Sequence, residues 1–290
     1  MFNFEFSRIK LEFQSLNEFR TPYFLGSTFR GIMGRKLKKT VCIKPSLDSC
    51  KDCEFKMTCP YTTVFETEAI LNQPSKYVMK PEFSNRNLKE NEILTLEITL
   101  LGETANYWEF LINSFSGVLN IGKERYIKLK NIYFYHVKEE KYHPVKSFIP
   151  KFEAKDILNK RTDKKKIETR FYPTSLKNMG KIVRFDEFNK DIFIKSILSR
   201  VSVVSQNYGE KKEKLFINKE NFNIGLQNLK PSPLKRWSNR KKKHMTIPAF
   251  EGEIVFEGEL KEIYPYLKII ENINIGKSVS FGLGNVKIES

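Results

Sequence analysis

Two hydrophobic patterns take turns along the first half of the chain: apolar residues at every second position, and apolar residues at helical spacing. Residues 2–13 place apolar side chains at every second position, which is typical of a half-buried strand. Apolar positions in residues 25–37 recur at helical spacing, residues 93–101 alternate again, and residues 108–119 carry a second helical pattern. Residues 126–137 complete the half as a strand. The pattern predicts strand, helix, cysteine-containing loop, strand, helix and strand.

The second half restarts the same pattern. Residues 167–175 are expected to form a strand and residues 193–204 a helix, followed by an alternating strand at 248–259. A short helix at 260–270 and a last strand at 285–289 end the chain. Each half therefore approximates the order β-α-β-β-α-β, which is the ferredoxin-like arrangement and the layout of many RNA-binding modules.

A short repeat supports two copies of one fold. The sequence NIGK occurs at 120–123 and again at 274–277, each time between a helical pattern and a final strand. We expect an α+β protein of two tandem ferredoxin-like (RRM-like) domains, residues 1–140 and 141–290. The predicted junction is the proline-containing and charged stretch that starts near residue 139.

The charge of the chain suggests a polyanionic partner. There are 51 Lys and Arg residues against 34 Asp and Glu, which gives a net charge of +17. Nucleic acid is the first candidate, an anionic membrane surface is the second, and a Lys-rich composition without a binding role is the third. There is no run of 18 apolar residues, and the N-terminus alternates like a strand and does not resemble a signal peptide. We therefore expect a cytoplasmic protein without membrane attachment.

All four cysteines lie close together, in a predicted insertion at about 42–66 of the first domain. In a reducing compartment such clustering favours metal ligation over disulfides. A Cys-x-x-Cys pair allows two thiolates to occupy adjacent corners of a tetrahedron. We expect a structural zinc site, with an iron–sulfur cluster or free thiols as alternatives. The predicted ligands are Cys42, Cys50, Cys53 and Cys59.

The first predicted helix has a basic face that includes two glycines. Gly31 and Gly34 lie among Arg30, Arg35 and Lys38 on the face opposite the apolar stripe. Because glycine lowers helix stability, something must approach the backbone closely there. The approach of a ligand such as RNA and close helix–sheet packing through the same glycines are equally good explanations.

The densest basic segment is residues 234–248, which prolines flank on both sides. It is predicted to be a loop or hairpin that binds single-stranded or hairpin RNA through phosphate contacts and a stacking tryptophan. The alternative is a solvated loop with the tryptophan in the core. The residues expected to contact RNA are Arg236, Trp237, Arg240, Lys241, Lys242 and Lys243.

His244 in this segment is a candidate catalytic residue, because histidine exchanges protons near neutral pH. A phosphate contact is the alternative role. The other two histidines, His136 and His143, flank a strand end and are expected to be structural. The sequence contains no phosphate-binding P-loop and no carboxylate cluster for two-metal catalysis. If the protein cuts nucleic acid, we expect RNA cleavage by the 2′-hydroxyl without a catalytic metal.

The second NIGK copy extends into a glycine-rich loop, whereas Glu124 and Arg125 follow the first copy. We expect the C-terminal loop to meet phosphates through exposed backbone N–H groups, and the first copy to be a structural turn. The residues expected to contact RNA are Lys277, Ser278, Ser280, Gly282 and Gly284.

Four motifs in the same order along the chain carry a family resemblance. They are FRGIMG at 29–34, CPYTTVFE at 59–66, RWSNR at 236–240 followed by FEGEIVFEG, and GKSVSFGLG at 276–284. With them the chain resembles the CRISPR repeat-processing endoribonucleases of the RAMP superfamily. The resemblance implies two ferredoxin-like domains, binding of a repeat hairpin in precursor CRISPR RNA, and metal-independent cleavage that leaves 2′,3′-cyclic phosphate and 5′-OH ends.

The resemblance leaves the catalytic residues open. Many members of the family place a histidine in or near the first helix, but no histidine precedes His136 in this chain. His244 is one candidate for proton transfer, and Lys and Tyr side chains are another. Arg30, Arg35 and Lys36 on the first predicted helix are the cations nearest the family's usual active site. One alternative is a non-catalytic RAMP subunit that holds processed RNA within a CRISPR effector complex. Another is a zinc-clamped RNA-binding module outside CRISPR systems.

Overall fold

The structure is a computed structural model that describes residues 2–47, 49–210, 215–238 and 242–289. It divides into an N-terminal unit, Glu5–Phe152, and a C-terminal unit, Met1–Phe4 with Glu153–Ser290. The boundary expected between residues 140 and 141 falls within the N-terminal unit, at the start of a short strand, β8.

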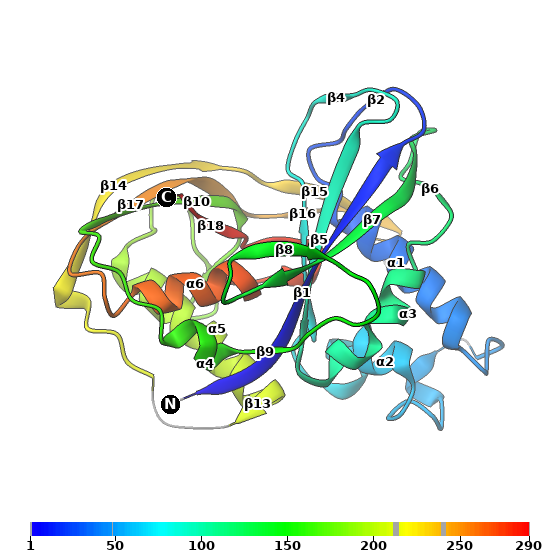
Figure 1. Cartoon of the computed structure of the whole chain (residues 1–290), viewed down its shortest axis with the longest axis horizontal. Helices are drawn as coiled ribbons and strands as arrows, with labels where there is room; N and C mark the ends of the chain where they lie inside the picture. Colours follow the sequence, from blue (N-terminus) through cyan, green and yellow to red (C-terminus); the bar gives the residue numbers. More distant parts are fainter. Residues whose placement is uncertain (1, 48, 211–214, 239–241, 290) are drawn as a thin grey trace. The chain divides into compact units, whose positions relative to one another are not determined.

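The antiparallel sheet of the N-terminal unit follows the path β3-β5-β1-β7-β6, and the short strand β8 also pairs with β7. Helices α1 and α3 pack on one face of this sheet (Figure 1). In chain order the elements are β1 (Asn3–Ser15), β2 (Phe19–Arg20), α1 (Gly26–Val41), α2 (Pro60–Val64), β3 (Tyr77–Pro81), β4 (Asn87–Leu88), β5 (Ile93–Leu101), α3 (Trp108–Asn113), β6 (Val118–Asn120), β7 (Tyr126–His136) and β8 (Lys141–Pro144).

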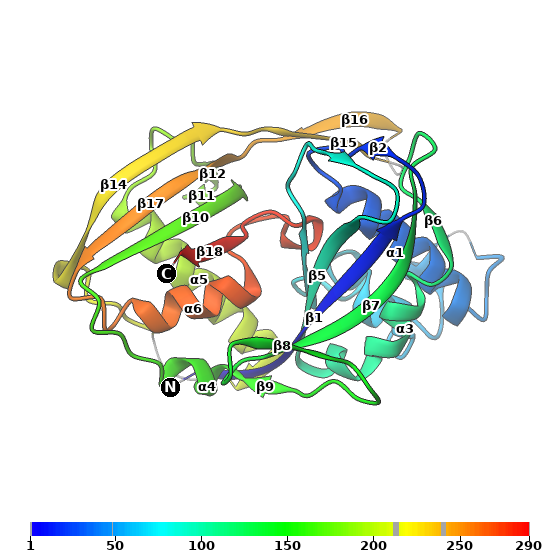
Figure 2. The same cartoon turned by 45° about the horizontal axis from the view of Figure 1, so that its top comes forward.

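The C-terminal unit repeats the arrangement, with the sheet order β14-β17-β10-β18. Helices α5 and α6 cover one face of this sheet (Figure 2). The boundary between the units falls within β9 (Phe152–Glu153). The elements after it are α4 (Ala154–Leu158), β10 (Lys166–Thr174), β11 (Lys177–Asn178), β12 (Lys181–Ile182), α5 (Lys190–Tyr208), β13 (Gly209–Glu210), β14 (Phe222–Pro231), β15 (Leu234–Ser238), β16 (Lys243–Ile247), β17 (Phe250–Gly258), α6 (Tyr264–Ile273) and β18 (Val286–Glu289). Both units are ferredoxin-like, so the predicted fold class is confirmed.

Two details differ from the sequence-based expectation. The helix expected at 108–119 ends at Asn113, and Gly117, with a positive φ of 72°, then turns the chain into β6. The second strand of each unit was not located in advance. β3 is buried at every position and β14 is mostly exposed, so neither has the alternation that marks a half-buried strand.

Aromatic side chains form much of each core. In the N-terminal unit the ring of Phe13 packs against Phe29 of α1 and Phe115, with centroid distances of 5.5 and 5.9 Å. In the C-terminal unit Phe193 of α5 packs in the same way against Phe171 and Phe256, at 5.7 and 5.2 Å. Such ring pairs add about 0.5–1.5 kcal/mol each beyond their burial, and they hold α1 and α5 on the sheets of their respective units.

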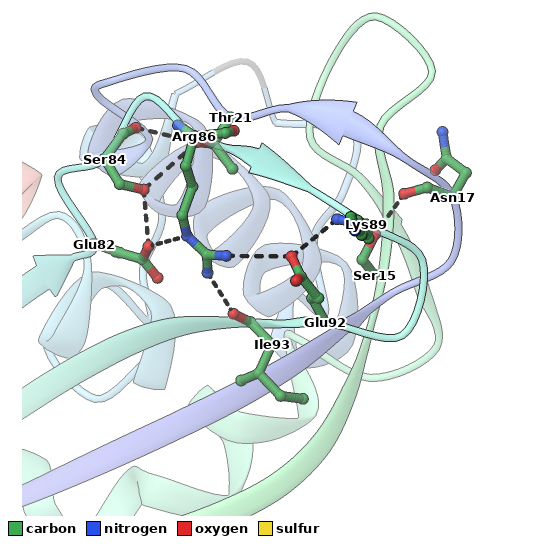
Figure 3. Close-up of polar contacts among 9 residues, drawn as sticks. All are labelled: Ser15, Asn17, Thr21, Glu82, Ser84, Arg86, Lys89, Glu92 and Ile93. Carbon is green, nitrogen blue, oxygen red and sulfur yellow. Dashed lines mark hydrogen bonds and ion pairs between the residues drawn. The ribbon is translucent and has the colours of Figure 1, made fainter.

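A polar network holds the loop that precedes β4 in the N-terminal unit (Figure 3). The Arg86 guanidinium donates to Glu82 Oε1 at 2.8 Å and to the Ile93 carbonyl at 2.7 Å, and it lies 3.4 Å from Glu92 Oε2. The Thr21 N–H donates to the Arg86 carbonyl at 2.9 Å. Arg86 is therefore a structural cation that ties the β2–β4 pair to β5.

Candidate nucleic-acid interface

The basic segment at 234–248 forms a two-stranded hairpin, β15–β16, in the C-terminal unit. Trp237 and His244 are cross-strand partners, and their rings meet edge to face with centroids 5.0 Å apart. Half of the Trp237 surface is exposed and His244 is exposed as well. The alternative in which Trp237 fills the core is therefore wrong. A solvent-facing indole beside an imidazole can stack on an unpaired base.

The remaining predicted residues of this hairpin are cations. Lys242 and Lys243 are exposed, at the turn and at the start of β16. Arg240 and Lys241 lie outside the described residues. The exposed ammonium groups can contact phosphates beside the Trp237 ring.

Arg236 connects the hairpin to the glycine-rich loop. Its guanidinium lies over the Phe281 ring, 4.6 Å from the centroid, and its Nη2 lies 3.8 Å from Met245 Sδ. A guanidinium on an aromatic face is stabilised by the ring quadrupole. Sequence reasoning missed Phe281. The signal available was an aromatic residue between the glycines of the GKSVSFGLG motif.

The glycine-rich loop does not present its glycine N–H groups to solvent as expected. The N–H of Gly282 donates to the Val279 carbonyl at 3.0 Å, and the N–H of Gly284 donates to the Pro173 carbonyl at 2.9 Å. Both glycines have positive φ values, so the tight turn that needs glycine also uses these donors. Ser280 is buried, Ser278 is half-buried and Lys277 is exposed. We expect Lys277 to be the loop's contact with phosphate.

The two NIGK copies differ in structure. In the first, Asn120 Oδ1 accepts the Gly122 N–H at 2.8 Å and forms a surface turn. In the second, Asn274 is fully buried and its Nδ2 donates to the Leu283 carbonyl at 2.9 Å. A Cβ atom on Gly284 would lie only 1.8 Å from the Ile275 carbonyl oxygen. Asn274 thus holds the glycine-rich loop from inside the fold.

The predicted cations of α1 have different surroundings. The Arg30 guanidinium lies over the Phe65 ring, 4.3 Å from its centroid, and Lys36 Nζ donates to the Ser116 carbonyl at 2.6 Å. Lys38 lies 5.9 Å from the Tyr61 ring, whereas Arg35 is exposed. These cations of α1 belong to the N-terminal unit, whereas His244 belongs to the C-terminal unit, where it follows Lys242 and Lys243.

The aromatic residues around Arg30 are buried. Burial raises the pKa of Tyr77 to about 12, and the positive charge of Arg30 opposes that rise. Burial likewise raises the pKa of Tyr61, and Glu66 beside it adds to the rise. Both phenols therefore stay protonated at neutral pH and act as neutral parts of the core.

The two glycines of α1 have separate explanations. A Cβ atom at Gly34 would lie 2.3 Å from the nearest atom of the Phe65 ring, so this glycine is required by packing. A Cβ atom at Gly31 would meet only the flexible end of Arg35, at 3.5 Å. Packing therefore accounts for Gly34, but the partner is Phe65 at the end of α2 and not the sheet as expected. Approach of a ligand remains a prediction for Gly31.

The four cysteines line one cavity of about 230 Å³ in the N-terminal unit. Burial raises the pKa of the Cys50 thiol, and the Lys38 ammonium acts in the opposite direction. Within the described ranges, no three His, Cys, Asp or Glu side chains form a preassembled metal-binding group. The four thiols therefore line the same cavity but are not positioned as a coordination sphere.

The other two histidines make contacts within the N-terminal unit. His143 Nε2 lies 2.9 Å from Glu139 Oε2, and His136 Nδ1 lies 3.4 Å from Glu139 Oε1. The His136 ring also packs edge to face on Phe152, with a centroid distance of 5.0 Å. These contacts are those of structural residues.

A charged and aromatic cluster lies on the β1 face opposite the core. Arg8 lies 4.6 Å from the Tyr135 ring and Lys10 lies 4.5 Å from the Tyr133 ring. Glu97 of β5 receives the Arg8 guanidinium at 2.6 Å and pairs across strands with both Lys10 and Lys80. Sequence reasoning missed this cluster, although Arg8, Lys10 and Glu12 alternate with apolar residues in β1.

Acid should weaken the N-terminal unit through Glu97. Burial alone would raise the pKa of this carboxyl, but Arg8 and Lys80 keep it below its ordinary value. Because the folded pKa is depressed, the stabilisation is present above the unfolded pKa of about 4.3 and is lost as pH falls through the folded pKa. We expect Glu97→Gln to lower stability at pH 7 by about 1–3 kcal/mol and to flatten the acid limb of the unfolding curve.

Chemical denaturation between pH 3 and pH 7 measures this effect. Glu109→Gln, at an exposed position of α3, is the matched control and should leave the pH dependence unchanged. Equal pH profiles for the wild-type protein and the Glu97→Gln variant would contradict the role of this ion pair.

Comparison with known families agrees with the two-unit architecture. Residues 4–155, just over half of the chain, match the family model described as the AF_1859_N N-terminal domain. Residues 169–286 match the model described as CRISPR-associated endoribonuclease Cas6. An uncharacterized protein of Archaeoglobus fulgidus is 30% identical over 117 residues. That match covers 38% of this chain and 39% of the relative, so the chain spans about two fifths of that protein's length.

Several solved structures share the fold over the full chain. A Cas6 product complex has a TM-score of 0.59 at 13% identity and covers 98% of this chain and 100% of its own. Thermus thermophilus Cas6 has a TM-score of 0.57 at 13% identity and covers 99% of each chain. A RAMP protein binding different RNA substrates has a TM-score of 0.53 at 14% identity, with 98% and 100% covered.

Two ferredoxin-like units in tandem are thus the fold that this chain shares with the Cas6 and RAMP structures. The chain belongs to the AF_1859_N family, whose N-terminal domain model matches residues 4–155, and residues 169–286 are similar to the Cas6 model. In the described part of the chain, no helix is both long enough and apolar enough to span a membrane.

Proposed function

We propose that this protein is an endoribonuclease that binds the repeat hairpin of precursor CRISPR RNA and cleaves within the repeat. The match to the Cas6 model over residues 169–286 carries the proposal, because that range contains both the basic hairpin and the glycine-rich loop. The net charge of +17 supports RNA as the substrate. Repeat RNA and its processed product are the proposed partners.

The proposed reaction needs no catalytic metal, because the RNA supplies its own nucleophile. The 2′-oxygen forms a bond to the neighbouring phosphorus as the bond from phosphorus to the 5′-oxygen breaks. A base accepts the 2′-hydroxyl proton and an acid returns a proton to the 5′-oxygen. The products carry a 2′,3′-cyclic phosphate and a 5′-OH.

His244 is the proposed proton-transfer residue. Its exposed ring on β16 is held beside Trp237, which would stack on an unpaired base of the repeat. Arg30 and Lys36 on α1 are the proposed cations that offset the negative charge on phosphorus in the transition state. Lys242, Lys243 and Lys277 would bind phosphates flanking the cut.

A second candidate function is a non-catalytic RAMP subunit of a CRISPR effector complex. Two observations favour it: Arg30 and Lys36 are engaged with Phe65 and Ser116, and no histidine precedes His136. A partial Cas6-RT-Cas1–Cas2 complex also shares the fold, with a TM-score of 0.56 at 12% identity. Other CRISPR proteins are the proposed partners in that case.

Incubation of the purified protein with repeat RNA in excess EDTA tests the first function. We expect a defined cut, with cyclic phosphate identified by mass spectrometry of the upstream fragment. A single 2′-deoxyribose at the cut site should abolish cleavage and leave binding unchanged. RNA that binds tightly and stays intact would overturn the enzyme proposal in favour of the second candidate. Cleavage that requires Mg²⁺ would overturn the metal-independent mechanism.

Truncation of the hairpin side chains should affect RNA binding in two distinguishable ways. Trp237→Ala should weaken binding by about 1–3 kcal/mol through the loss of base stacking, with an unchanged salt dependence. Lys243→Ala should weaken binding of all sequences and reduce the slope of log K against log salt by about 0.7–0.9. Fluorescence anisotropy with 2′-deoxy-blocked repeat RNA over a salt series measures both.

An exposed lysine remote from this hairpin provides the control. Lys261→Ala, in the segment before α6, should leave affinity and salt slope close to wild type. Identical behaviour of the Trp237→Ala and Lys261→Ala variants would exclude a stacking role for Trp237.

A further inference from the structure

All four cysteines lie at the ends of secondary-structure elements in the N-terminal unit. Cys42 ends α1, and its N–H donates to the Lys38 carbonyl at 2.9 Å. Cys50 begins a single 3₁₀ turn and Cys53 ends it. Cys59 immediately precedes α2. The cysteines thus lie at the ends of three separate elements, and these ends meet at one cavity.

This is the cavity of about 230 Å³ described above. Its wall combines the four free thiols with apolar side chains that include Val41, Leu47 and Phe55. Lys38 and Lys44 line the same cavity, so it holds sulfur donors together with positive charge. Clustered thiols of this kind favour a soft metal ion over disulfides in a reducing compartment.

The segment between α1 and α2 has no hydrophobic core of its own. None of its described residues from Cys42 to Pro60 is buried. Its large apolar side chains are instead exposed: Ile43 is 71% exposed, Met57 is 68% exposed and Phe55 is 40% exposed. A segment that buries so little needs a covalent or metal link to keep one conformation. The four thiols are the groups available to make that link.

We propose that Cys42, Cys50, Cys53 and Cys59 bind one Zn²⁺ as four thiolates. Cys50 and Cys53 form the Cys-x-x-Cys knuckle that suits two adjacent corners of a zinc tetrahedron. Each thiol loses its proton to solvent on binding, and the Lys38 ammonium offsets part of the negative charge of the complex, whereas Lys44 is already paired with Glu54. Binding of the ion would bring the four thiols of the cavity wall into one coordination sphere. With four protein ligands it has no open position for catalysis.

The proposed ion would act on the candidate RNA-binding helix through packing. It would join the end of α1 to the start of α2, and α2 leads directly to Phe65. The Phe65 ring fills the notch at Gly34 and supports the Arg30 guanidinium. Loss of the ion should therefore loosen the α1–α2 packing and the position of Arg30.

Elemental analysis of the full chain, purified without chelators and then dialysed, tests the site. We expect about one zinc per chain, and X-ray absorption should give four Zn–S distances of about 2.3 Å. The double variant Cys50→Ser, Cys53→Ser should retain less than a tenth of the wild-type zinc. Met57→Ser, an exposed position in the same segment, is the matched control and should retain all of it.

Cobalt substitution of the wild-type protein keeps the test independent of whether the cysteine variants fold. Protein stripped of metal at low pH and refolded with Co²⁺ should show the intense visible bands of tetrahedral thiolate cobalt. Less than a tenth of an equivalent of zinc together with no such bands would overturn the proposal. Stoichiometric iron and sulfide, or two disulfides in protein purified under reducing conditions, would overturn it as well.

Discussion

Replacing His244 with alanine should slow RNA cleavage by about 10²–10⁴-fold, the usual contribution of a general acid or base. Affinity for uncleavable repeat RNA should change far less, because phosphate contacts and stacking supply most of the binding. The structural reason is the exposed position of His244 on β16, fixed against Trp237 by their edge-to-face contact. Single-turnover cleavage at saturating protein, with anisotropy for binding, separates the two effects.

The chain contains its own control for this prediction. His143 is held by Glu139 in the N-terminal unit, and His143→Ala should leave the cleavage rate at the wild-type level. If His244→Ala cleaves at the wild-type rate, His244 is not the proton-transfer residue. A slower rate explained fully by weaker binding would assign His244 to phosphate contact, which is the alternative that its sequence context left open.

Replacing Gly34 with alanine should destabilise the N-terminal unit by about 1–2 kcal/mol. The new Cβ would lie 2.3, 2.6 and 2.8 Å from three carbons of the Phe65 ring. That ring cannot move freely, because it stacks on Tyr61 and Tyr77 and lies beneath Arg30. Overpacking costs about 1–3 kcal/mol, and the better helix propensity of alanine returns about 1 kcal/mol of this.

Gly31 is the matched control on the same helix. Gly31→Ala should stabilise the unit by up to about 1 kcal/mol, because its Cβ has room and alanine favours the helix. Chemical denaturation compares the two variants, and adding Phe65→Leu to Gly34→Ala should restore part of the loss. Equal effects at Gly31 and Gly34 would contradict the packing argument. Weaker RNA binding by the stabilised Gly31→Ala protein would identify Gly31 as a point of RNA approach.

The sequence located the regular elements that bury one face. Apolar residues at every second position predicted the strands β1 and β5, and apolar residues three or four positions apart predicted the helices α1 and α5. Half-buried strands and helices require these spacings. β3 and β14 were missed since one is wholly buried and the other mostly exposed. Helix α3 was predicted too long, because apolar spacing at 115–119 continued past the residue where Gly117 turns the chain.

The sequence predicted which residues make up the candidate site, but not the long-range contacts between them. A basic hairpin with Trp237 and His244 follows from a dense local run of cations between prolines. The contact of Arg236 with Phe281 joins residues far apart in sequence, so no local pattern contains it. The same reason hid the Arg8–Glu97 pair, whose members lie on different strands.

By itself the sequence determined the two ferredoxin-like halves, the positive charge, the cysteine cluster and the basic hairpin, because periodicity, composition and spacing are local properties. Only the tertiary structure decided the roles of identical residue types. It assigned Gly34 to contact with Phe65 and left Gly31 open, and it made one NIGK copy a surface turn and the other a buried brace through Asn274. Those roles depend on which distant atoms approach each residue, and only the folded chain brings these atoms together.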